Sequence, residues 1–343
     1  MGKNDIEIRQ GMIMGGNRRK RSISVVMCTF NGERYLREQL DSILRQTYPV
    51  AELIVQDDGS TDNTCAIVQE YAERYPFIRL YRNDAKLGIN RNFFSAMQRS
   101  QGDLIAISDQ DDVWESDKLE KQMDAIGDKM LCTGKSSPFV DEKDIHVSID
   151  MRPANYNLLR ILFVGAFAGH ATLFTRALLD ETLQLSPFFP PRLYDVILGL
   201  VAAAHDSIVY IDAPLVRHRR HLHNATKTYF SVSGNRKTIG NIKDTAKEAW
   251  RLYRKLRPGI LQILKSEERF LSEIHSQAPI RKEGLKILHL YSSRYLTDFI
   301  RLCLFCARRG NLLTFAQGRQ TLSTYLRGAV FPIYSALYYK HLL

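Results

Sequence analysis

The sequence predicts an α/β domain built around a mostly parallel sheet flanked by helices, followed by a basic α-helical region. In the first half of the chain, short apolar runs alternate with stretches of helical periodicity. Past Thr226, apolar residues recur at intervals of three and four, with Lys and Arg between them. A length of 343 residues, 45% of them hydrophobic, suffices for one large domain with an appended region.

Four strands and three helices are expected before residue 120. The strands are short apolar runs that end at polar or turn residues, namely residues 22–28, 52–56, 77–81 and 103–108. Leu36, Leu40 and Leu44 share one helical face, and capping side chains at 60–63 predict a helix that runs to Tyr75. A third helix is expected around residues 93–97.

The elements beyond residue 120 are less regular. Residues 125–157 show little periodicity, and we expect a loop with short strands there. The remaining pattern predicts strands at 171–175 and 207–212 and helices at 176–184 and 194–204. We expect three parts. Residues 1–21 form a basic flexible segment, residues 22–225 form the α/β domain with halves 22–120 and 121–225, and residues 226–343 form the basic helical region.

Charge is unevenly distributed along the chain, whose net charge is +11. Residues 216–343 carry 24 Lys and Arg against 7 Asp and Glu. Such a region could meet nucleic acid or an anionic membrane surface, and a solvated helical surface is the alternative. Five thinly spread cysteines form no disulfide framework, and the apolar runs are too short for a spanning helix or a secretory signal. We therefore expect a cytoplasmic protein.

Polar residues follow the predicted strands, where ligands bind in open α/β sheets. The first strand leads into Thr29-Phe30-Asn31-Gly32, a turn suited to stacking on a base and hydrogen bonding its edge. The second leads into Asp57-Asp58-Gly59-Ser60, which equally fits an ordinary Asp-Gly turn followed by a helix cap.

Three carboxylates follow the fourth strand, at Asp109, Asp111 and Asp112. Such crowding is unfavourable unless a cation neutralises the carboxylates or some of them take up protons. Mg²⁺ and Mn²⁺ prefer oxygen ligands, and Mg²⁺ commonly combines protein carboxylates with substrate phosphates. The sequence therefore predicts a divalent cation and a diphosphate beside Asp109 and Asp111. An acidic turn that caps a helix beginning near Asp117 is the alternative.

The chain carries five linked motifs, Thr29-Phe30-Asn31-Gly32, Leu44-x-Gln46-Thr47-Tyr48, Asp57-Asp58-Gly59-Ser60-Thr61-Asp62, Gly88-x-x-x-Asn92-Phe93 and Asp109-Gln110-Asp111-Asp112-Val113-Trp114. In this order and spacing they resemble the family 2 glycosyltransferases, in particular bacterial rhamnosyltransferases and related enzymes of surface-polysaccharide synthesis (O-antigen or capsule). The likeness is firm over residues 22–120 and weaker over 160–225. It implies a nucleotide-diphosphate-sugar-binding, Rossmann-like fold of the GT-A type, a divalent metal and an inverting transfer to a hydroxyl acceptor.

The resemblance also implies roles for individual residues. The nucleoside pocket would be lined by Thr29, Phe30 and Asn31. Asp58 would accept a hydrogen bond from a pyrimidine ring. Asp109 and Asp111 would bind the Mg²⁺ or Mn²⁺ ion that bridges the diphosphate, and Asp112 would hold the donor sugar.

Inversion requires a general base that removes the proton of the acceptor hydroxyl. The family resemblance points to Asp195 at the start of an apolar helix, where a capping role is the alternative. His170 belongs either to an acceptor-side segment or to the core. Residues 217–224 are expected to form a cationic turn after the last strand. There Arg219 and His221 match the family's Arg-x-His motif and would grip the diphosphate or complete the metal shell.

The implied donor is dTDP-rhamnose or a UDP-hexose, and the implied acceptor is a saccharide on polyprenyl diphosphate. The segment 291–309, apolar on one side and basic on the other, would then lie on an anionic membrane surface, which would make the protein peripheral to the inner face of the cytoplasmic membrane. A nucleotidyltransferase would also need aspartates and a metal, but the turn at 29–32 is no Gly-rich basic phosphate loop. A nucleic-acid-binding protein has only the basic charge in its favour, so we expect no nucleic-acid partner.

Overall fold

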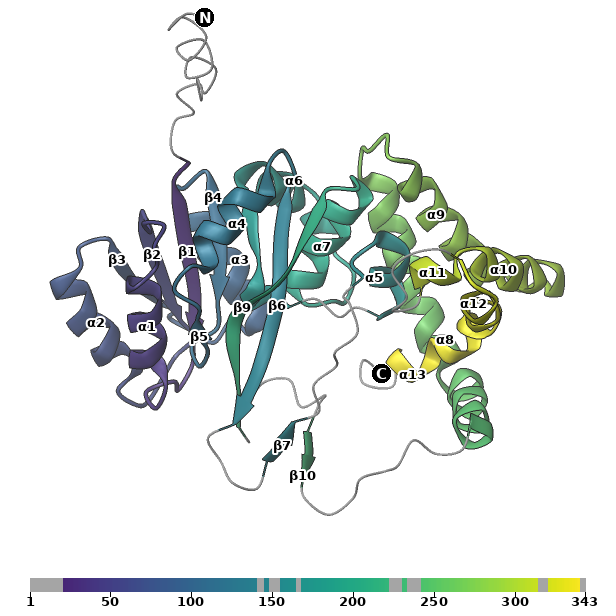
Figure 1. The fold of residues 1–343 in the computed structure, drawn as a ribbon, viewed down its shortest axis with the longest axis horizontal. Coiled ribbons are helices and arrows are strands. Elements are labelled where there is room, and N and C mark those ends of the chain that lie inside the picture. The colour runs from purple at the N-terminus through teal and green to yellow at the C-terminus, as the bar shows by residue number, and fades with distance from the viewer. Residues whose placement is uncertain are drawn as a thin grey trace, which may run out of the picture.

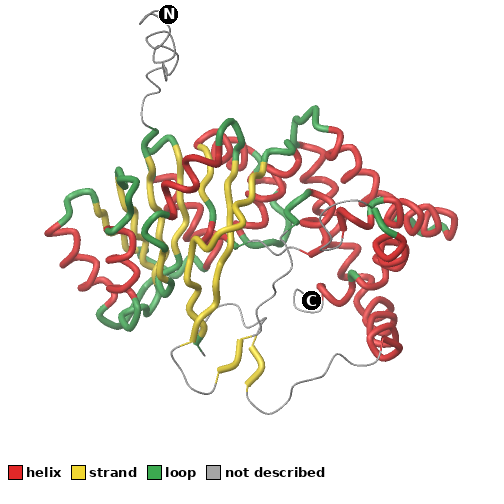
Figure 2. Tube along the Cα trace, viewed as in Figure 1, coloured by secondary structure: helices red, strands yellow, loops and turns green. Residues whose placement is uncertain are grey.

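The computed structural model describes residues 21–140, 145–147, 155–164, 168–221, 230–232, 242–313 and 320–339. A mixed sheet flanked by helices forms one end of the molecule, and a group of helices forms the other (Figures 1 and 2). Apart from Arg21, the expected basic segment 1–21 lies outside the described residues, as does the expected boundary at residues 225 and 226.

The first half of the sheet is parallel, as the sequence predicts. Its spatial order is β3-β2-β1-β4, with β1 (Ile23–Thr29), β2 (Glu52–Asp57), β3 (Ile78–Arg82) and β4 (Leu104–Ser108). The connecting helices are α1 (Leu36–Leu44), α2 (Thr64–Arg74) and α3 (Ile89–Arg99). Val25 and Val26 are buried on opposite faces, which is why these strands are continuous apolar runs. Their carboxyl ends meet at one edge of the sheet.

The second half of the sheet is mixed and continues in the order β8-β6-β9-β5. It consists of β5 (Val113–Trp114), β6 (Leu131–Val140), β8 (Leu173–Thr175) and β9 (Ile208–Arg220). β8 runs antiparallel to β4 and β6, whereas β6 and β9 are parallel. β5 pairs antiparallel with the far part of β9, which brings the segment after β4 against the end of β9.

A ten-residue strand, β6, occupies part of the stretch 125–157, where the sequence predicts a loop with only short strands. β6 contains Gly134 and Pro138 and few apolar side chains, which leaves little local strand signal. Its pairing with β9 along the whole length makes it a strand, with register shifts beside Gly134. A Cβ atom at Gly134 would lie 2.4 Å from Leu215 Cδ1, so the Leu215 side chain fills the space that a larger residue would need.

The last strand extends well past residue 212, which corrects the expected cationic turn at 217–224. Arg217 to Arg220 are strand residues paired in register with β6, and His221 follows the strand directly. Residues 222–224 lie outside the described part of the chain. Basic side chains are compatible with a strand here because carboxylates contact several of them.

The other elements of the sheet region are α4 (Lys118–Ile126), α5 (Leu158–Val164), η1 (Gly169–Ala171), α6 (Arg176–Gln184), η2 (Ser186–Phe188) and α7 (Tyr194–Ala204). α6 and α7 have the predicted bounds. β7 (Ile145–Val147) and β10 (Phe230–Val232) form a separate antiparallel pair. The C-terminal region is helical, as predicted, with α8 (Ile242–Glu273), α9 (Pro279–Ser292), α10 (Leu296–Arg308), α11 (Gly310–Leu313), α12 (Leu322–Tyr334) and α13 (Ala336–Tyr339). Among the described helices, none has the length and apolar character needed to cross a membrane.

Two hydrophobic cores lie on opposite faces of the sheet. One joins the sheet to α1, α2 and α4. The other joins Val26 and Ile105 of the sheet to α3, α5, α6 and α7, and extends without a break into the C-terminal helices as far as Tyr339. The C-terminal helices are therefore packed as part of the main body.

Candidate active site

The turn after β1 is held against the turn after β2. The Thr29 hydroxyl donates to Asp57 Oδ2 over 3.0 Å, and the Asn31 amide donates to Ser60 Oγ over 2.8 Å. Asn31 has a positive φ of 48°, which asparagine tolerates better than most residues, and its side chain accepts the Thr61 amide over 2.9 Å. The predicted nucleoside-binding turn is thus a rigid loop.

The Phe30 ring is 41% exposed, although its backbone is fixed. The Phe30 amide donates to Gln110 Oε1 over 2.9 Å, and Gln110 Nε2 donates back to the Phe30 carbonyl over 3.0 Å. A Cβ atom at Gly32 would lie 2.3 Å from Gln110 Oε1, so glycine is needed beside this contact. Lys86 Nζ lies 3.7 Å from the Phe30 ring centroid. An exposed ring with a cation beside it is suited to a base and a nearby phosphate.

Asp57 and Asp58 have different roles in the fold. Asp57 Oδ1 accepts the Ser60 amide over 2.8 Å and so closes the Asp-Gly turn. Asp58 Oδ1 accepts bonds from Asn83 Nδ2 at 2.9 Å and from the Leu87 amide at 2.6 Å. Asp58 Oδ2 accepts the Gly88 amide at 2.9 Å. The Asp58 carboxylate therefore anchors the loop before α3, and Oδ2 retains capacity for one more donor.

Asp111 faces His221 across the end of β9. His221 Nε2 lies 2.8 Å from Asp111 Oδ2, and the two side chains are only 9% and 15% exposed. The imidazole also packs on the Tyr35 ring, with 5.0 Å between ring centroids. Arg219 Nε donates to the Asp111 carbonyl over 2.9 Å, and its guanidinium pairs with Glu38. Arg219 is 3% exposed, so in this structure it fixes the backbone of Asp111 from within the protein.

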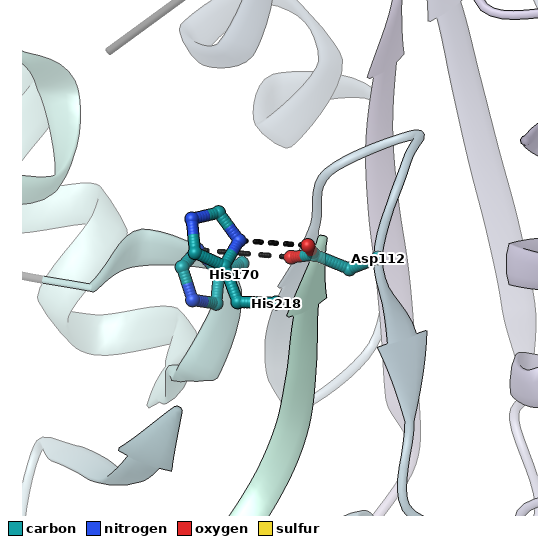
Figure 3. Close-up of side chains that lie close together, drawn as sticks. All are labelled: Asp112, His170 and His218. Atoms are coloured by element: carbon teal, nitrogen blue, oxygen red, sulfur yellow. Dashed lines mark hydrogen bonds and ion pairs between the residues drawn. The ribbon is translucent and has the colours of Figure 1, made fainter. Parts of the chain in front are cut away.

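Asp112 is fully buried and its carboxylate faces two histidines (Figure 3). Its Oδ1 lies 2.7 Å from His218 Nδ1 and accepts the Arg219 amide over 3.0 Å. His170 Nδ1 lies 3.8 Å from Asp112 Oδ2 and 3.4 Å from Asp109 Oδ2. The two imidazoles stack, with ring centroids 4.4 Å apart. The structure thus brings together all three predicted aspartates and adds two histidines to them.

Burial shifts the proton affinities of this group. Burial, together with the charges of Asp109 and Asp111, raises the pKa of Asp112 to about 8. Burial and the nearby Arg220 lower the pKa of His218 to about 4. The Asp112–His218 pair is therefore held without net charge at neutral pH, and a bound cation would change that balance.

The donor set of this site suits a divalent cation. Asp112, His170 and His218 each offer one ligand atom, and these atoms lie within 4.8 Å of one another. Asp112 Oδ2 is buried without a hydrogen-bond partner, which is costly unless a proton or a cation satisfies it. Asp111 and His221 form a second carboxylate–imidazole pair at the same edge. Mixed oxygen and nitrogen donors fit Mn²⁺, whereas Mg²⁺ favours oxygen alone.

Asp195 lies at the start of α7, and residues of α3 hold this end of the helix in place. Asn90 Oδ1 accepts the Tyr194 amide over 2.8 Å, and Asn90 Nδ2 donates to the Arg192 carbonyl over 2.8 Å. Tyr194 also stacks on Phe93, with ring centroids 4.0 Å apart. These contacts set the position of the Asp195 backbone relative to α3.

The Asp195 carboxylate is close to the acidic cluster. A Cβ atom at Gly169 would lie 3.1 Å from Asp195 Cβ, and the next residue in η1 is His170, which contacts Asp109. Asp195 Oδ1 accepts the Val196 amide over 2.8 Å, but Asp195 is the second residue of α7 and does not cap the helix, whose N-cap residue is Leu193. Burial raises the pKa of Asp195 to about 7, opposed by the Val196 hydrogen bond and assisted by the charge of Asp109. Such a carboxylate can exchange a proton near neutral pH.

Three residues of this region, Gln110, Asn90 and His218, have no role predicted from the sequence. Local signals for them are weak, because their partners are distant in the chain. His218 is 106 residues from Asp112, Asn90 is 104 residues from Tyr194, and Gln110 is 80 residues from its contacts at Phe30.

Residues 24–182 match the family described as Glycosyl transferase family 2. An uncharacterized glycosyltransferase of Haemophilus influenzae is 35% identical over 193 residues, which cover 55% of this chain and 75% of that protein. TuaG of Bacillus subtilis, a glycosyltransferase named for teichuronic acid biosynthesis, is 38% identical over 105 residues, which cover 30% of this chain and 40% of TuaG. The dTDP-rhamnosyl transferase RfbG of Shigella flexneri is 36% identical over 105 residues, which cover 29% and 36% of the two chains. The chain thus matches well under half the length of TuaG and RfbG.

The crystal structure of Staphylococcus aureus TarS residues 1–349 has a similar fold. It superposes with a TM-score of 0.52 at 15% identity, covering 94% of this chain and 92% of that chain. The same TarS fragment in complex with UDP gives a TM-score of 0.50 at 13% identity with the same coverage. At these identities the likeness concerns the fold alone.

Proposed function

The chain belongs to glycosyl transferase family 2 and has a fold of the GT-A type, and on that premise we propose that it transfers a sugar from a nucleotide-diphosphate sugar to a hydroxyl of a saccharide acceptor, with inversion at the anomeric carbon. One observation carries the proposal: the carboxylates after β4 and Asp195 at the start of α7 are gathered at one edge of the sheet. The first group can retain a leaving diphosphate, and Asp195 can accept the proton of the attacking hydroxyl.

The donor that we propose is dTDP-rhamnose or a UDP-hexose. Phe30, 41% exposed beside Thr29 and Asn31, offers a ring for the base to stack on. The remaining acceptor position on Asp58 Oδ2 suits the ring N–H of a pyrimidine. The names of RfbG and TuaG, a dTDP-rhamnosyl transferase and a protein of teichuronic acid biosynthesis, support a place in bacterial surface-polysaccharide synthesis, with an acceptor saccharide on polyprenyl diphosphate.

The metal ligands that we propose are Asp109, Asp111 and His221, for Mn²⁺ or Mg²⁺. A bound cation supplies Lewis-acid stabilisation of the charge on the departing nucleoside diphosphate. Asp112 Oδ1 accepts the Arg219 amide, and Arg219 Nε donates to the Asp111 carbonyl. Because Asp112 is buried and Arg219 nearly so, we assign them the positioning of Asp111 and the end of β9 rather than direct contact with sugar or phosphate.

Asp195 is the proposed general base. Its backbone is fixed by Asn90, and the helix N-terminus stabilises the carboxylate form, whereas burial opposes it. The resulting pKa of about 7 leaves a basic form that is populated at neutral pH and strong enough to assist deprotonation of a hydroxyl.

Calorimetric titration of UDP and dTDP into the protein, with and without Mn²⁺, tests the nucleotide and metal parts of the proposal. We expect Mn²⁺-dependent binding that Asp111→Asn weakens by roughly a hundredfold or more. Asp117→Asn is the matched control, because Asp117 is a half-buried N-cap residue that pairs with Lys121. If the Asp111→Asn protein binds normally and His218→Asn does not, the metal belongs to the buried Asp112–His170–His218 group instead. Absence of nucleotide binding with either metal would refute the proposal.

A screen of UDP-hexoses and dTDP-rhamnose for hydrolysis or transfer identifies the donor. Proton NMR of the first-formed product reports whether the anomeric configuration is inverted. Retention of configuration would contradict the assignment of Asp195 as a general base.

A further inference from the structure

We propose that the exposed faces of α10 and α12 form a docking surface for a membrane with anionic headgroups. The proposal is independent of the glycosyl transfer proposed above, since it depends only on the C-terminal helices. In Figure 1 these helices lie at the end of the molecule opposite β3 and α2.

α10 presents a continuous apolar stripe to solvent. Leu296, Ile300 and Leu304 follow one another at intervals of four residues and are 74%, 52% and 48% exposed. The opposite face of the helix is occupied by the buried Leu302 and Cys306, so the exposed stripe is not needed for packing within the chain.

α12 carries a second stripe. Leu322, Leu326 and Val330 follow the same spacing and are 76%, 57% and 44% exposed. The two helices are in close contact, because a Cβ atom at Gly328 would lie 2.2 Å from the Cys306 carbonyl oxygen. Six exposed aliphatic side chains on two adjoining helices exceed the scattered apolar residues that are ordinary on a surface.

Basic and aromatic side chains accompany these stripes. Between residues 294 and 339 the sequence has six arginines and one acidic residue, Asp298. Asp298 pairs with Arg301, Arg309 pairs with Glu283 of α9, and Arg319 lies outside the described residues. Arg308 and Arg327 are exposed on α10 and α12, and Tyr295 is 75% exposed beside Leu296. Aliphatic, tyrosine and arginine side chains together are typical of helices that lie in the headgroup region of a bilayer.

The positive charge of this surface favours an anionic membrane over a second copy of the chain as its partner. A twofold interface would place this surface against itself and bring its arginines face to face. An anionic bilayer attracts the same arginines and accepts the aliphatic side chains below its headgroups. The sequence predicts a membrane-facing surface on segment 291–309 alone. In the structure α12 packs alongside α10, so the proposed surface includes both helices.

Flotation of the full-length protein with vesicles tests the proposal. We expect binding to vesicles of phosphatidylglycerol and phosphatidylethanolamine, little binding to phosphatidylcholine, and release as salt rises from about 0.1 M to about 0.5 M. Substitution of Arg301, Arg308 and Arg327 by Gln should lower the vesicle partition coefficient about a hundredfold, since each arginine near an anionic surface contributes roughly a factor of five. The matched control replaces Arg251, Arg254 and Lys255 by Gln, three exposed cations on α8 outside this surface.

A second variant, with Leu296, Ile300 and Leu304 replaced by Ser, separates insertion from charge attraction. These residues are exposed, so the variant should keep its circular dichroism spectrum and melting temperature and lose most vesicle binding. Equal partition onto both kinds of vesicle, no binding, or an equal loss in the α8 control would overturn the proposal. So would a dimer in analytical ultracentrifugation that this variant converts to monomer while vesicle binding is unchanged, because the surface would then serve self-association.

Discussion

Replacing Glu267 by Gln removes one charge from an ion pair buried where α8 meets the segment before α7. Arg192 Nε lies 2.7 Å from Glu267 Oε1, and the two side chains are 2% and 0% exposed. The guanidinium also donates to the Leu162 carbonyl over 3.1 Å and contacts the Tyr339 hydroxyl at 3.4 Å. The pair therefore links the C-terminal helices to the start of the helix that carries Asp195.

The magnitude of the effect follows from this geometry. At 2.7 Å and an effective dielectric constant of about 20, the attraction is about 6 kcal/mol, and the desolvation of two buried ions offsets most of it. In Glu267→Gln the desolvation of Arg192 is no longer offset, because only neutral oxygens face its charge. We expect the free energy of unfolding to fall by about 3 to 5 kcal/mol. The double variant Arg192→Met/Glu267→Leu should recover most of that loss.

Urea unfolding of the wild type, Glu267→Gln and the double variant Arg192→Met/Glu267→Leu, followed by circular dichroism, measures these differences. A loss below about 1 kcal/mol in Glu267→Gln, or a double variant no more stable than Glu267→Gln, would refute the reasoning.

Three further predictions concern other sites. Burial lowers the pKa of Lys118 to about 7 from 10.5 in the unfolded chain. Between these two pH values the unfolded state binds more protons than the folded state, so the free energy of unfolding should rise with pH. In urea unfolding, Lys118→Met should remove this pH dependence and stabilise the protein at pH 7 by roughly 2 to 4 kcal/mol. The transfer rate should fall about tenfold per unit as pH drops below the Asp195 pKa of about 7, whereas Asp195→Asn should lower the rate roughly a thousandfold above pH 7 and remove this pH dependence; a variant with wild-type rates would contradict the base assignment. Gly32→Ala should displace Gln110 from Phe30 and weaken UDP binding by about tenfold in calorimetry, with little change in melting temperature; unchanged affinity would show that the contact does not shape the pocket.

The parallel half of the sheet can be predicted because its signals are local. Each buried strand is an apolar run of a few residues, and Leu36 and Leu40 show the helical period without reference to any partner. α6 and α7 are predictable for the same reason. The three aspartates after β4 also fall within four consecutive positions of the chain, so their crowding follows directly from the order of the residues.

The rest of the site depends on contacts between distant segments. β6 and the far part of β9 have weak strand signals and become strands because they pair with each other, which places Arg217 to Arg220 in the sheet. The stack of His170 on His218 joins residues from η1 and β9, and no local pattern connects them. The shared core is likewise hidden in the sequence, since amphipathic helices alone do not show which surface they cover.

The shared core also has a consequence for how the chain is made. One core is complete once residue 216 is available, so that face of the sheet can form while translation continues. The other core requires residues up to Tyr339, whose hydroxyl donates to the Leu162 carbonyl 177 positions earlier over 3.2 Å. Until the ribosome has released that tyrosine, the apolar faces of α5 and α7 that pack against the C-terminal helices have no cover. This window is when a chaperone would be needed, and substitutions near the C-terminus should appear first as lower yield of folded protein.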